Sequence, residues 1–475
     1  MPVFSSYFQL GRTQRELDFV DVDTDQDTPV YVDPYAIEIR DDVWAAQASG
    51  HIRSLFLEVL TALRAGDTAR ATNLMSHFHE PRETFLGVSR HEPQGRGVGA
   101  VQSAQLVRAI RRSEAFTSGI LADLSEMSLY VEKVDRDKIS DLTTNIIRHL
   151  LADYTKQQCD LYAIPVSDYN GPPGWNASRN NWTSKTVLLP YVDGKPVLLV
   201  PKYIVRRRLS LDSQEFYNKQ ITDYLVAEHY RANSSLVQAI KGGKEQKVYK
   251  KDVRKANPKS KSLIADIVKK HPDILDTFKK IAKTTSSMAT FRNDDPSLQR
   301  VCRSLVDALT AISPGTAAAD EYHRLMMGAL TVLFYPDLIQ PHKEWEINGG
   351  RKRVDVVYTN AASDNFFAHR RDGNTQANVV IVECKNYSTD IGNEELDQLL
   401  GRFDNNRGRF GILTCRHIDK PATVLARCRD MAVRGTGFVI VLTDANILEM
   451  LEAKGNLRDE HIYEMLHAKY RELLQ

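Results

Sequence analysis

Apolar, β-branched runs alternate with helical stretches throughout residues 301–475, and this alternation limits the possible folds more than any other feature of the chain. Helices that alternate with buried strands cover the faces of a sheet, so the pattern predicts an αβ domain with a mixed central sheet. We expect strands at 343–348, 353–358, 378–384, 409–415 and 437–442, and helices at 319–334, 394–404, 421–433, 445–453 and 458–473.

The preceding part of the chain has a different pattern. Residues 43–158 carry apolar side chains at helical spacing, for example Ile52 and Leu55. Before them, alternating acidic and apolar residues predict short strands at 17–23 and 29–34, whose aspartates we assign to solvated faces and turns rather than to a metal site. The expected fold class is therefore α+β or α/β, with a mostly helical N-terminal module, short β elements and a C-terminal αβ domain.

Loops and a hairpin separate these parts. Residues 165–182 are rich in turn formers and predict a long loop, which a β-hairpin with its turn at Asp193-Gly194 follows. The glycine-rich stretch 87–99 lacks the Walker ending, so we expect a plain loop rather than a phosphate cradle. At about 150 residues per domain, we expect a mainly helical domain at 1–165, a hairpin with a basic helical or linker region at 166–295, and the αβ domain at 296–475.

The charge is distributed unevenly, although the whole chain carries a formal net charge of only +2. Residues 1–60 hold 11 acidic and 4 basic side chains, a net charge of −7, whereas residues 201–300 hold 22 basic and 11 acidic ones, a net charge of +11. The lysine-rich stretch 241–261 predicts an exposed linker or arm. On charge alone, a surface that faces a polyanion and a merely solvated surface are equally supported.

The sequence contains no apolar run of about 18 residues that would span a membrane, and no signal peptide is recognisable. The five cysteines are scattered and form no CxxC pair, so neither a zinc ribbon nor a disulfide framework is expected. These features favour a soluble protein of the reducing cytoplasm.

Charged residues occur where two strands should be buried. Asp355 interrupts the apolar run 354–358, and the run 379–382 ends in Glu383 and Lys385, which lie two residues apart and therefore on one face of a strand. Two carboxylates on adjacent buried strands repel each other unless a cation lies between them. We therefore expect Asp355 and Glu383 to hold a divalent ion, and their oxygen ligands favour Mg²⁺ or Mn²⁺ over zinc.

Two more residues of this region suit the chemistry of phosphodiester hydrolysis. Lys385 would orient the attacking water, lower its pKa or neutralise charge in the transition state. Glu321 shares helical spacing with Leu325 and Gly328, so we expect it to face inward and to reach the site as a further metal ligand. The alternative for Glu321 is a carboxylate that only complements the helix dipole.

The segment Glu383-Cys384-Lys385, with Asp355 upstream and the helical Glu321 before it, resembles the PD-(D/E)xK restriction-endonuclease-like superfamily, and the Mrr-like group is the nearest branch. The similarity extends over residues 318–453. It implies that Asp355 and Glu383 bind metal together with the Cys384 backbone carbonyl, and that Lys385 is catalytic.

The resemblance also implies a glutamine in the helix after this strand, which Gln398 matches. Two positions depart from the family pattern. Val354 rather than a proline precedes Asp355, and Arg402 stands four residues after Gln398, where a tyrosine is frequent.

Basic residues around these positions fit a nucleic-acid substrate. We expect Arg353, Arg402 and Arg409 to neutralise phosphates beside the cut, with ordinary surface charge as the alternative. The lysine-rich arm is expected to bind DNA phosphates through Lys247, Lys250, Lys251 and Lys255. The histidines without zinc-ligand spacing, which we expect to be ordinary surface or core residues, are His323, His342 and His417.

The combined expectation is a Mg²⁺- or Mn²⁺-dependent endonuclease that hydrolyses DNA, fused to an N-terminal sensing or interaction module. Such fusions resemble the effectors of bacterial restriction and anti-phage defence systems, which implies DNA as a partner, another defence protein bound to the N-terminal module, and a homo-oligomer. The alternatives are a catalytically inactive nuclease fold that serves as a DNA-binding or assembly module, and an enzyme of the same kind that cuts RNA.

Overall fold

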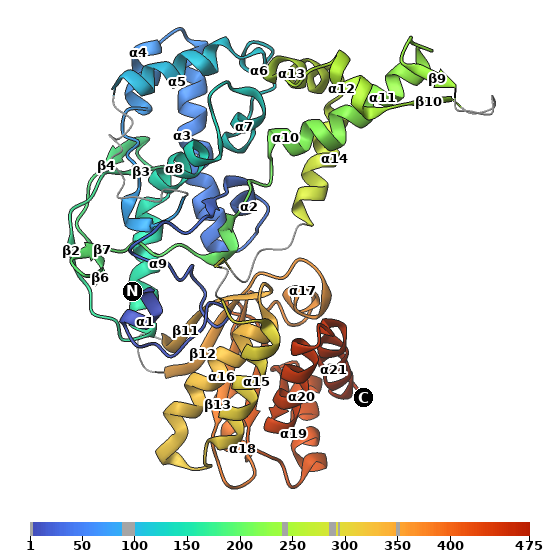
Figure 1. Ribbon diagram of the computed structural model, residues 1–475. Helices are drawn as coiled ribbons and strands as arrows, with labels where there is room; N and C mark the ends of the chain where they lie inside the picture. Colours follow the sequence, from blue (N-terminus) through green and yellow to red (C-terminus); the bar gives the residue numbers. More distant parts are fainter. Residues whose placement is uncertain (1–2, 88–99, 240–245, 285–290, 293–294, 348–351) are drawn as a thin grey trace.

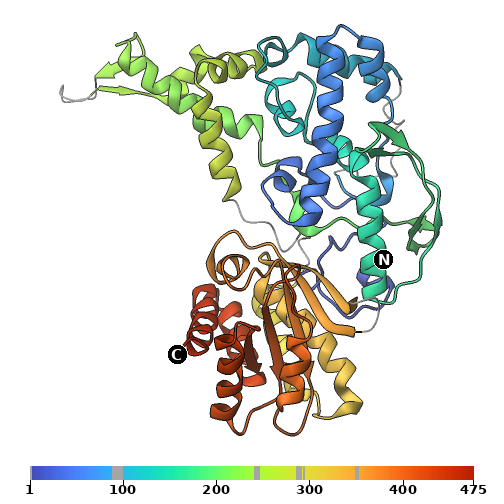
Figure 2. The same ribbon diagram turned by 180° about the vertical axis from the view of Figure 1, so that it is seen from behind.

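The chain folds around two hydrophobic cores. The computed structural model describes residues 3–87, 100–239, 246–284, 291–292, 295–347 and 352–475, so residues 88–99 of the glycine-rich stretch lie outside it. The first core belongs to the N-terminal domain and the second to the C-terminal domain. Figure 1 shows the N-terminal domain, coloured blue to yellow-green, above the C-terminal domain, and Figure 2 shows both from behind.

Helices make up most of the N-terminal domain. The Asp42 side chain caps α3 (Val43–Arg64), which buries the face that carries Ile52 and Leu55, as the apolar spacing predicts. The other helices up to residue 216 are α1 (Phe4–Tyr7), α2 (Pro34–Glu38), α4 (Thr68–Leu74), α5 (Ala100–Arg112), α6 (Glu114–Thr117), α7 (Met127–Tyr130), α8 (Arg136–Ile146), α9 (Arg148–Leu161) and α10 (Ser213–Phe216).

Short strands accompany these helices in two-stranded pairs. The turn at Asp193-Gly194 joins two of them, as expected, whereas the stretch 165–182 contains three short strands instead of forming one long loop. The strands are β1 (Tyr31–Val32), β2 (Ser167–Tyr169), β3 (Gly174–Asn176), β4 (Asn181–Thr183), β5 (Val187–Leu189), β6 (Tyr191–Val192), β7 (Lys195–Pro196) and β8 (Val205–Arg206).

The aspartates near the N-terminus contradict our expectation of solvated strand faces. Residues 17–23 form no strand, and both Asp18 and Asp21 are buried. Asp21 accepts hydrogen bonds from the backbone N–H and the hydroxyl of Ser5, and Asp33 accepts one from Tyr35 N at the start of α2. These carboxylates therefore satisfy backbone donors inside the domain, a role that alternation alone does not reveal.

Most buried apolar side chains of residues 166–283 join those of residues 4–164 in the first cluster, from which Val248 and Val253 are absent. From residue 246 on, the lysine-rich stretch contains β10 and α12, so its described part fits the arm rather than the linker of our two expectations. Its elements are α11 (Thr222–Arg231), β9 (Val237–Ala239), β10 (Gln246–Val248), α12 (Lys250–Ala256), α13 (Lys261–Lys270) and α14 (Pro272–Lys283). We call α11, β9, β10 and α12 the basic arm; it projects from the N-terminal domain (Figure 1).

The C-terminal domain is built on one sheet with the strand order β11-β12-β13-β14-β15. The first three strands are antiparallel to one another and the last three are parallel, so the sheet is mixed and the expected fold class is confirmed. The strands are β11 (Leu338–Ile347), β12 (Lys352–Asn360), β13 (Val379–Lys385), β14 (Phe410–Cys415) and β15 (Phe438–Thr443).

The helices of this domain alternate with the strands. Those expected at 319–334 and 421–433 are present with the same bounds, whereas α15 and α17 were not predicted. The helices are α15 (Leu298–Ala311), α16 (Ala319–Phe334), α17 (Asn365–Arg371), α18 (Asn393–Leu400), α19 (Pro421–Val433), α20 (Asp444–Gly455) and α21 (Asp459–Glu472). Among the described helices, none is long and apolar enough to cross a membrane.

Buried polar contacts join the two domains at the start of β11. Asp18 Oδ1 accepts a hydrogen bond from Gln340 N at 3.0 Å, and Asp18 Oδ2 accepts one from the Tyr154 hydroxyl of α9 at 2.8 Å. Lys202 is fully buried beside them, with its Nζ 4.1 Å from the centre of the Tyr335 ring. The N-terminal domain is thus anchored to the edge strand that borders β12.

Candidate active site

Asp355 and Glu383 meet where β12 and β13 stop pairing. The register of the two strands ends at Val356 opposite Val382, so the next residues along each strand are Asp355 and Glu383. Beyond that point the Asp355 side chain serves as the acceptor in place of a backbone carbonyl, because its Oδ2 accepts a hydrogen bond from Cys384 N at 2.9 Å. The expected proximity of the two carboxylates is therefore present in the structure.

Glu383 is fully buried and faces two cations. Its Oε2 lies 3.5 Å from Lys385 Nζ, and its Oε1 lies 3.4 Å from Arg402 Nε. Burial and then the neighbouring Asp355 carboxylate raise the pKa of Glu383 above its usual value, while Lys385 and Arg402 act in the opposite direction. Two carboxylates and two cations are thus packed together at this end of the sheet.

Lys385 is held in place from the helix that follows its strand. Its ammonium donates to Gln398 Oε1 of α18 at 3.1 Å, and only 8% of the residue is exposed. Lys385, Gln398 and Glu383 are therefore brought together as expected. The ammonium group is positioned by two acceptors instead of moving freely in solvent.

The helix α16 brings His323 rather than Glu321 to this region, so our expectation that Glu321 faces inward was wrong. Glu321 is exposed, whereas His323 Nε2 lies 2.8 Å from the Cys384 carbonyl oxygen and 4.0 Å from Asp355 Oδ2. A usable signal existed in the sequence, because His323 shares i+3, i+4 and i+7 spacing with side chains that are all buried. These are Met326, Met327 and Leu330.

Three oxygen groups that suit a divalent cation gather here: the carboxylates of Asp355 and Glu383 and the carbonyl oxygen of Cys384, which accepts a hydrogen bond from His323 Nε2. Oxygen donors of this kind fit Mg²⁺ or Mn²⁺. The oxygen groups present therefore fit the expected metal, and His323 orients the Cys384 carbonyl from the helix.

A second group of possible ligands lies in the loops after β13 and β14, formed by Asp390, His417 and Asp419. The Asp390 carboxylate already accepts hydrogen bonds from the backbone N–H groups of Asp419 and Lys420. His417 and Asp419 are both more than two-fifths exposed at their side chains. These hydrogen bonds explain the cluster as a contact between the two loops.

The three arginines expected to contact DNA lie in different places. Arg353 is exposed near Glu344, at 3.8 Å. Arg402 is buried on Glu383, so it does not present its charge to solvent. Arg409 precedes β14, whose parallel register pairs Cys415 with Lys385, and it therefore lies at the opposite end of the strand from the site. The expectation of a phosphate contact is therefore wrong for Arg402, which is a buried partner of Glu383, whereas it stays a prediction for Arg353 and Arg409.

The four lysines of the basic arm lie far from this site, on the opposite side of the molecule from α18 (Figure 1). Lys251 and Lys255 are exposed on α12. Lys250 forms an ion pair with Asp223, and Lys247 lies over the Tyr249 ring at 5.2 Å. The arm therefore presents basic charge on an ordered surface that is separate from the candidate site.

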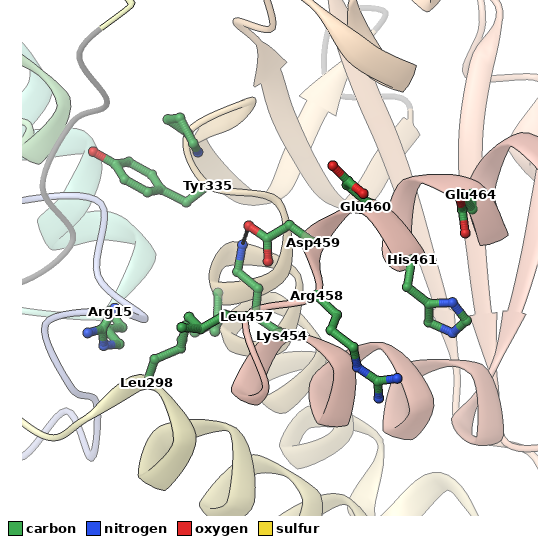
Figure 3. Close-up of a pocket in the computed structure, with 12 residues that line it drawn as sticks. Arg15, Leu298, Tyr335, Lys454, Leu457, Arg458, Asp459, Glu460, His461 and Glu464 are labelled. Carbon is green, nitrogen blue, oxygen red and sulfur yellow. Dashed lines mark hydrogen bonds and ion pairs between the residues drawn. The ribbon is translucent and has the colours of Figure 1, made fainter.

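A hollow of about 890 Å³ lies elsewhere, between Arg15 of the N-terminal domain and the turn from α20 to α21 (Figure 3). Its lining carries both charge signs, and Lys454 is paired with Asp459 at 2.9 Å. None of the residues at the ends of β12 and β13 lines it. Volume alone does not indicate chemistry, so the candidate site remains the cluster around Glu383.

Comparison with known proteins adds information about the N-terminal domain. Residues 9–212 match the model of DUF8370, a domain of unknown function. Neither the comparison with curated proteins nor the one with solved structures found a match. The matched segment ends before the basic arm and includes none of the residues of the candidate site.

Proposed function

We propose that the C-terminal domain is a metal-dependent nuclease that hydrolyses DNA phosphodiester bonds, as its resemblance to the PD-(D/E)xK superfamily implies. The observation that carries the proposal is the buried cluster at the ends of β12 and β13. There Asp355 and Glu383 lie side by side, and the Lys385 ammonium is 3.5 Å from Glu383. An apolar core would stabilise the fold at a lower desolvation cost than this charged cluster, so the cluster indicates a role beyond stability.

Each residue has a role in this proposal. Asp355, Glu383 and the Cys384 carbonyl would hold Mg²⁺ or Mn²⁺, which would polarise the phosphodiester and acidify water, and His323 would orient the carbonyl through its hydrogen bond. Lys385 places a positive charge beside the attacked phosphate, where it stabilises the transition state. Gln398 keeps the lysine in position through its 3.1 Å hydrogen bond.

The remaining parts of the chain have supporting roles. The basic arm adds affinity for phosphates, and the N-terminal domain carries a sensing or interaction role, as in the restriction and defence proteins that the C-terminal domain resembles. A protein bound to that domain would be the partner that controls cleavage.

A plasmid-cleavage assay tests the proposal. The wild type should cut in Mg²⁺ or Mn²⁺ but not in EDTA or Ca²⁺, because Ca²⁺ is larger and acidifies water less. Asp355→Asn, Glu383→Gln and Lys385→Met should each lower the rate by at least about 100-fold, the range typical of losing an electrostatic catalytic group.

Glu321→Gln is the matched control, since Glu321 is exposed on the same helix as His323. It should cut at the wild-type rate, whereas His323→Ala should require more metal. Cleavage in EDTA, or cleavage by all three site variants at the wild-type rate, would show that the hydrolytic site lies elsewhere.

A further inference from the structure

Each group that offers an oxygen ligand already faces a hydrogen-bond donor from the protein. The Cys384 carbonyl oxygen lies 2.8 Å from His323 Nε2, and Asp355 Oδ2 accepts from Cys384 N. The two oxygens of Glu383 face Lys385 and Arg402, one each. The protein's own cations therefore occupy the positions around Glu383 from which a metal ion would approach.

Arg402 differs from the other donors in this set. Lys385 has a second acceptor in Gln398 and belongs to the same strand as Glu383, so it remains close whatever occupies the site. Arg402 comes from the chain just after α18, and its guanidinium is nine-tenths buried against Glu383 Oε1 at 3.4 Å. A guanidinium cannot lose its charge in a protein, so Arg402 presents a positive charge to Glu383 at every accessible pH.

We infer that Arg402 is the resident counter-cation of Glu383 and that a divalent ion must displace it to fill the site. The inference rests on the proposed function for the identity of the site. A buried carboxylate without a partner is strongly disfavoured, so Arg402 stabilises the metal-free protein. The same positive charge opposes a cation arriving at Glu383 Oε1, so Arg402 sets the metal concentration at which the nuclease becomes active.

A purely structural role for Arg402 makes a different prediction. Removing a structural ion pair lowers stability and leaves metal affinity unchanged, whereas removing a competing cation raises metal affinity. Binding of Mn²⁺, followed by the loss of the free-ion signal in electron paramagnetic resonance, separates the two roles without any measurement of cleavage.

The experiment compares the full-length wild type with two neutral replacements, Arg402→Gln and Arg402→Met. Both should bind Mn²⁺ at least about tenfold more tightly than the wild type, because a unit charge within contact distance of a buried site is worth one pKa unit or more. Methionine keeps the length and apolar packing of the arginine stem, so Arg402→Met provides the test if the glutamine variant does not fold.

One control keeps the positive charge at position 402, and the other removes a positive charge elsewhere. Arg402→Lys retains the positive charge and should stay within about threefold of the wild type, since charge rather than shape is proposed to matter. Arg409→Gln removes the same charge at the far end of β14 and should leave the affinity unchanged.

The possible results are distinct. Unchanged or weaker Mn²⁺ binding in both neutral variants, with the wild type binding normally, overturns the role of Arg402 and leaves the proposed function standing. Absence of site-specific Mn²⁺ binding in the wild type and in both neutral variants overturns the metal site itself, and with it both proposals. Binding that appears only after Arg402 is neutralised supports the inference in its strongest form.

Discussion

Single carboxylates in this protein behave according to what surrounds them. Glu383 is buried between two cations, which suits a group that exchanges partners with a metal. Asp141 on α8 has a different environment, where burial, Asp137 and Glu80 raise its pKa to about 8. Since no cation compensates it to the same extent, Asp141 affects stability rather than catalysis.

A pH-dependent stability effect follows for Asp141. Its folded-state pKa is above the value of about 3.9 in unfolded chains, so its contribution is fully present below that pH and is lost as the pH rises through about 8. Asp141→Asn cannot ionise and should escape this loss. Urea unfolding should show the variant gaining at least about 1 kcal/mol on the wild type between pH 5.5 and pH 8.5.

The control for this measurement is Asp266→Asn, since Asp266 is an exposed carboxylate on α13. Its difference from the wild type should be the same at both pH values. An equally constant difference for Asp141→Asn would mean that the carboxylate is charged throughout and is not destabilised by its surroundings.

Residue-level expectations succeeded where backbone pattern determined them. Asp355, Glu383 and Lys385 came together because a charged residue in an apolar strand leaves little freedom in its placement. The helix was harder to interpret, since Glu321 and His323 lie two residues apart on nearly opposite faces and only packing against β13 decides which one points inward. That decision depends on tertiary packing, which spacing along one helix does not contain.

Among the elements, the basic arm is the one whose role is most open to direct measurement. Lys247, Lys250, Lys251 and Lys255 lie on β10 and α12, an ordered surface, so their charges are spatially fixed. Replacing all four with alanine should weaken DNA binding equally for all sequences. It should also reduce the slope of log K against log salt by roughly 0.9 for each phosphate that the arm no longer neutralises. We expect about three phosphate contacts to be lost.

Four surface lysines of the N-terminal domain provide a charge-matched control, and these are Lys133, Lys156, Lys185 and Lys195. Their replacement should leave the salt slope unchanged. Equal slopes for the wild type and the arm variant would indicate that the arm binds a protein or only keeps the chain in solution. Cleavage at saturating DNA should persist in both variants, because neither set lies at the candidate site.

Element boundaries were best predicted where apolar periodicity was strong. The bounds of α16 and α19 match the expectation, and β13 differs by one residue at each end. The stretch 241–261 was expected to be an exposed linker or arm because few of its residues are apolar. Val248 and Val253 nevertheless anchor β10 and α12, and two buried side chains are too few to recognise in a lysine-rich sequence.

At the scale of the whole molecule, the contact between the domains depends on buried polar groups that no local pattern reveals. Asp18 accepts from Gln340 N and from the Tyr154 hydroxyl, which belong to different domains. Asp18 and Gln340 are more than 300 positions apart in the chain. Sequence alone placed Asp18 on a solvated strand, since the partner that buries it comes from the other domain.

Asp18→Asn should therefore weaken the contact between the domains. The asparagine NH₂ group can still pair with the Tyr154 hydroxyl, which accepts as well as donates, but the change removes the negative charge that faces the buried Lys202. The free energy of unfolding should fall by about 1–3 kcal/mol. Asp25→Asn changes a neighbouring carboxylate that is two-fifths exposed, and it should alter stability by no more than about 0.5 kcal/mol. Equal stability of the two variants would show that Asp18 does not join the domains.

The central claim is that the ends of β12 and β13 hold a divalent cation for phosphodiester hydrolysis. A crystal structure of the full chain with Mn²⁺, in which the metal is located by its anomalous scattering, tests this most directly. The account predicts a peak about 2.0–2.6 Å from oxygens of Asp355 and Glu383, with the Arg402 guanidinium displaced from Glu383. A Mn²⁺ peak at Asp390, His417 and Asp419 instead, with Arg402 still seated on Glu383, would contradict it.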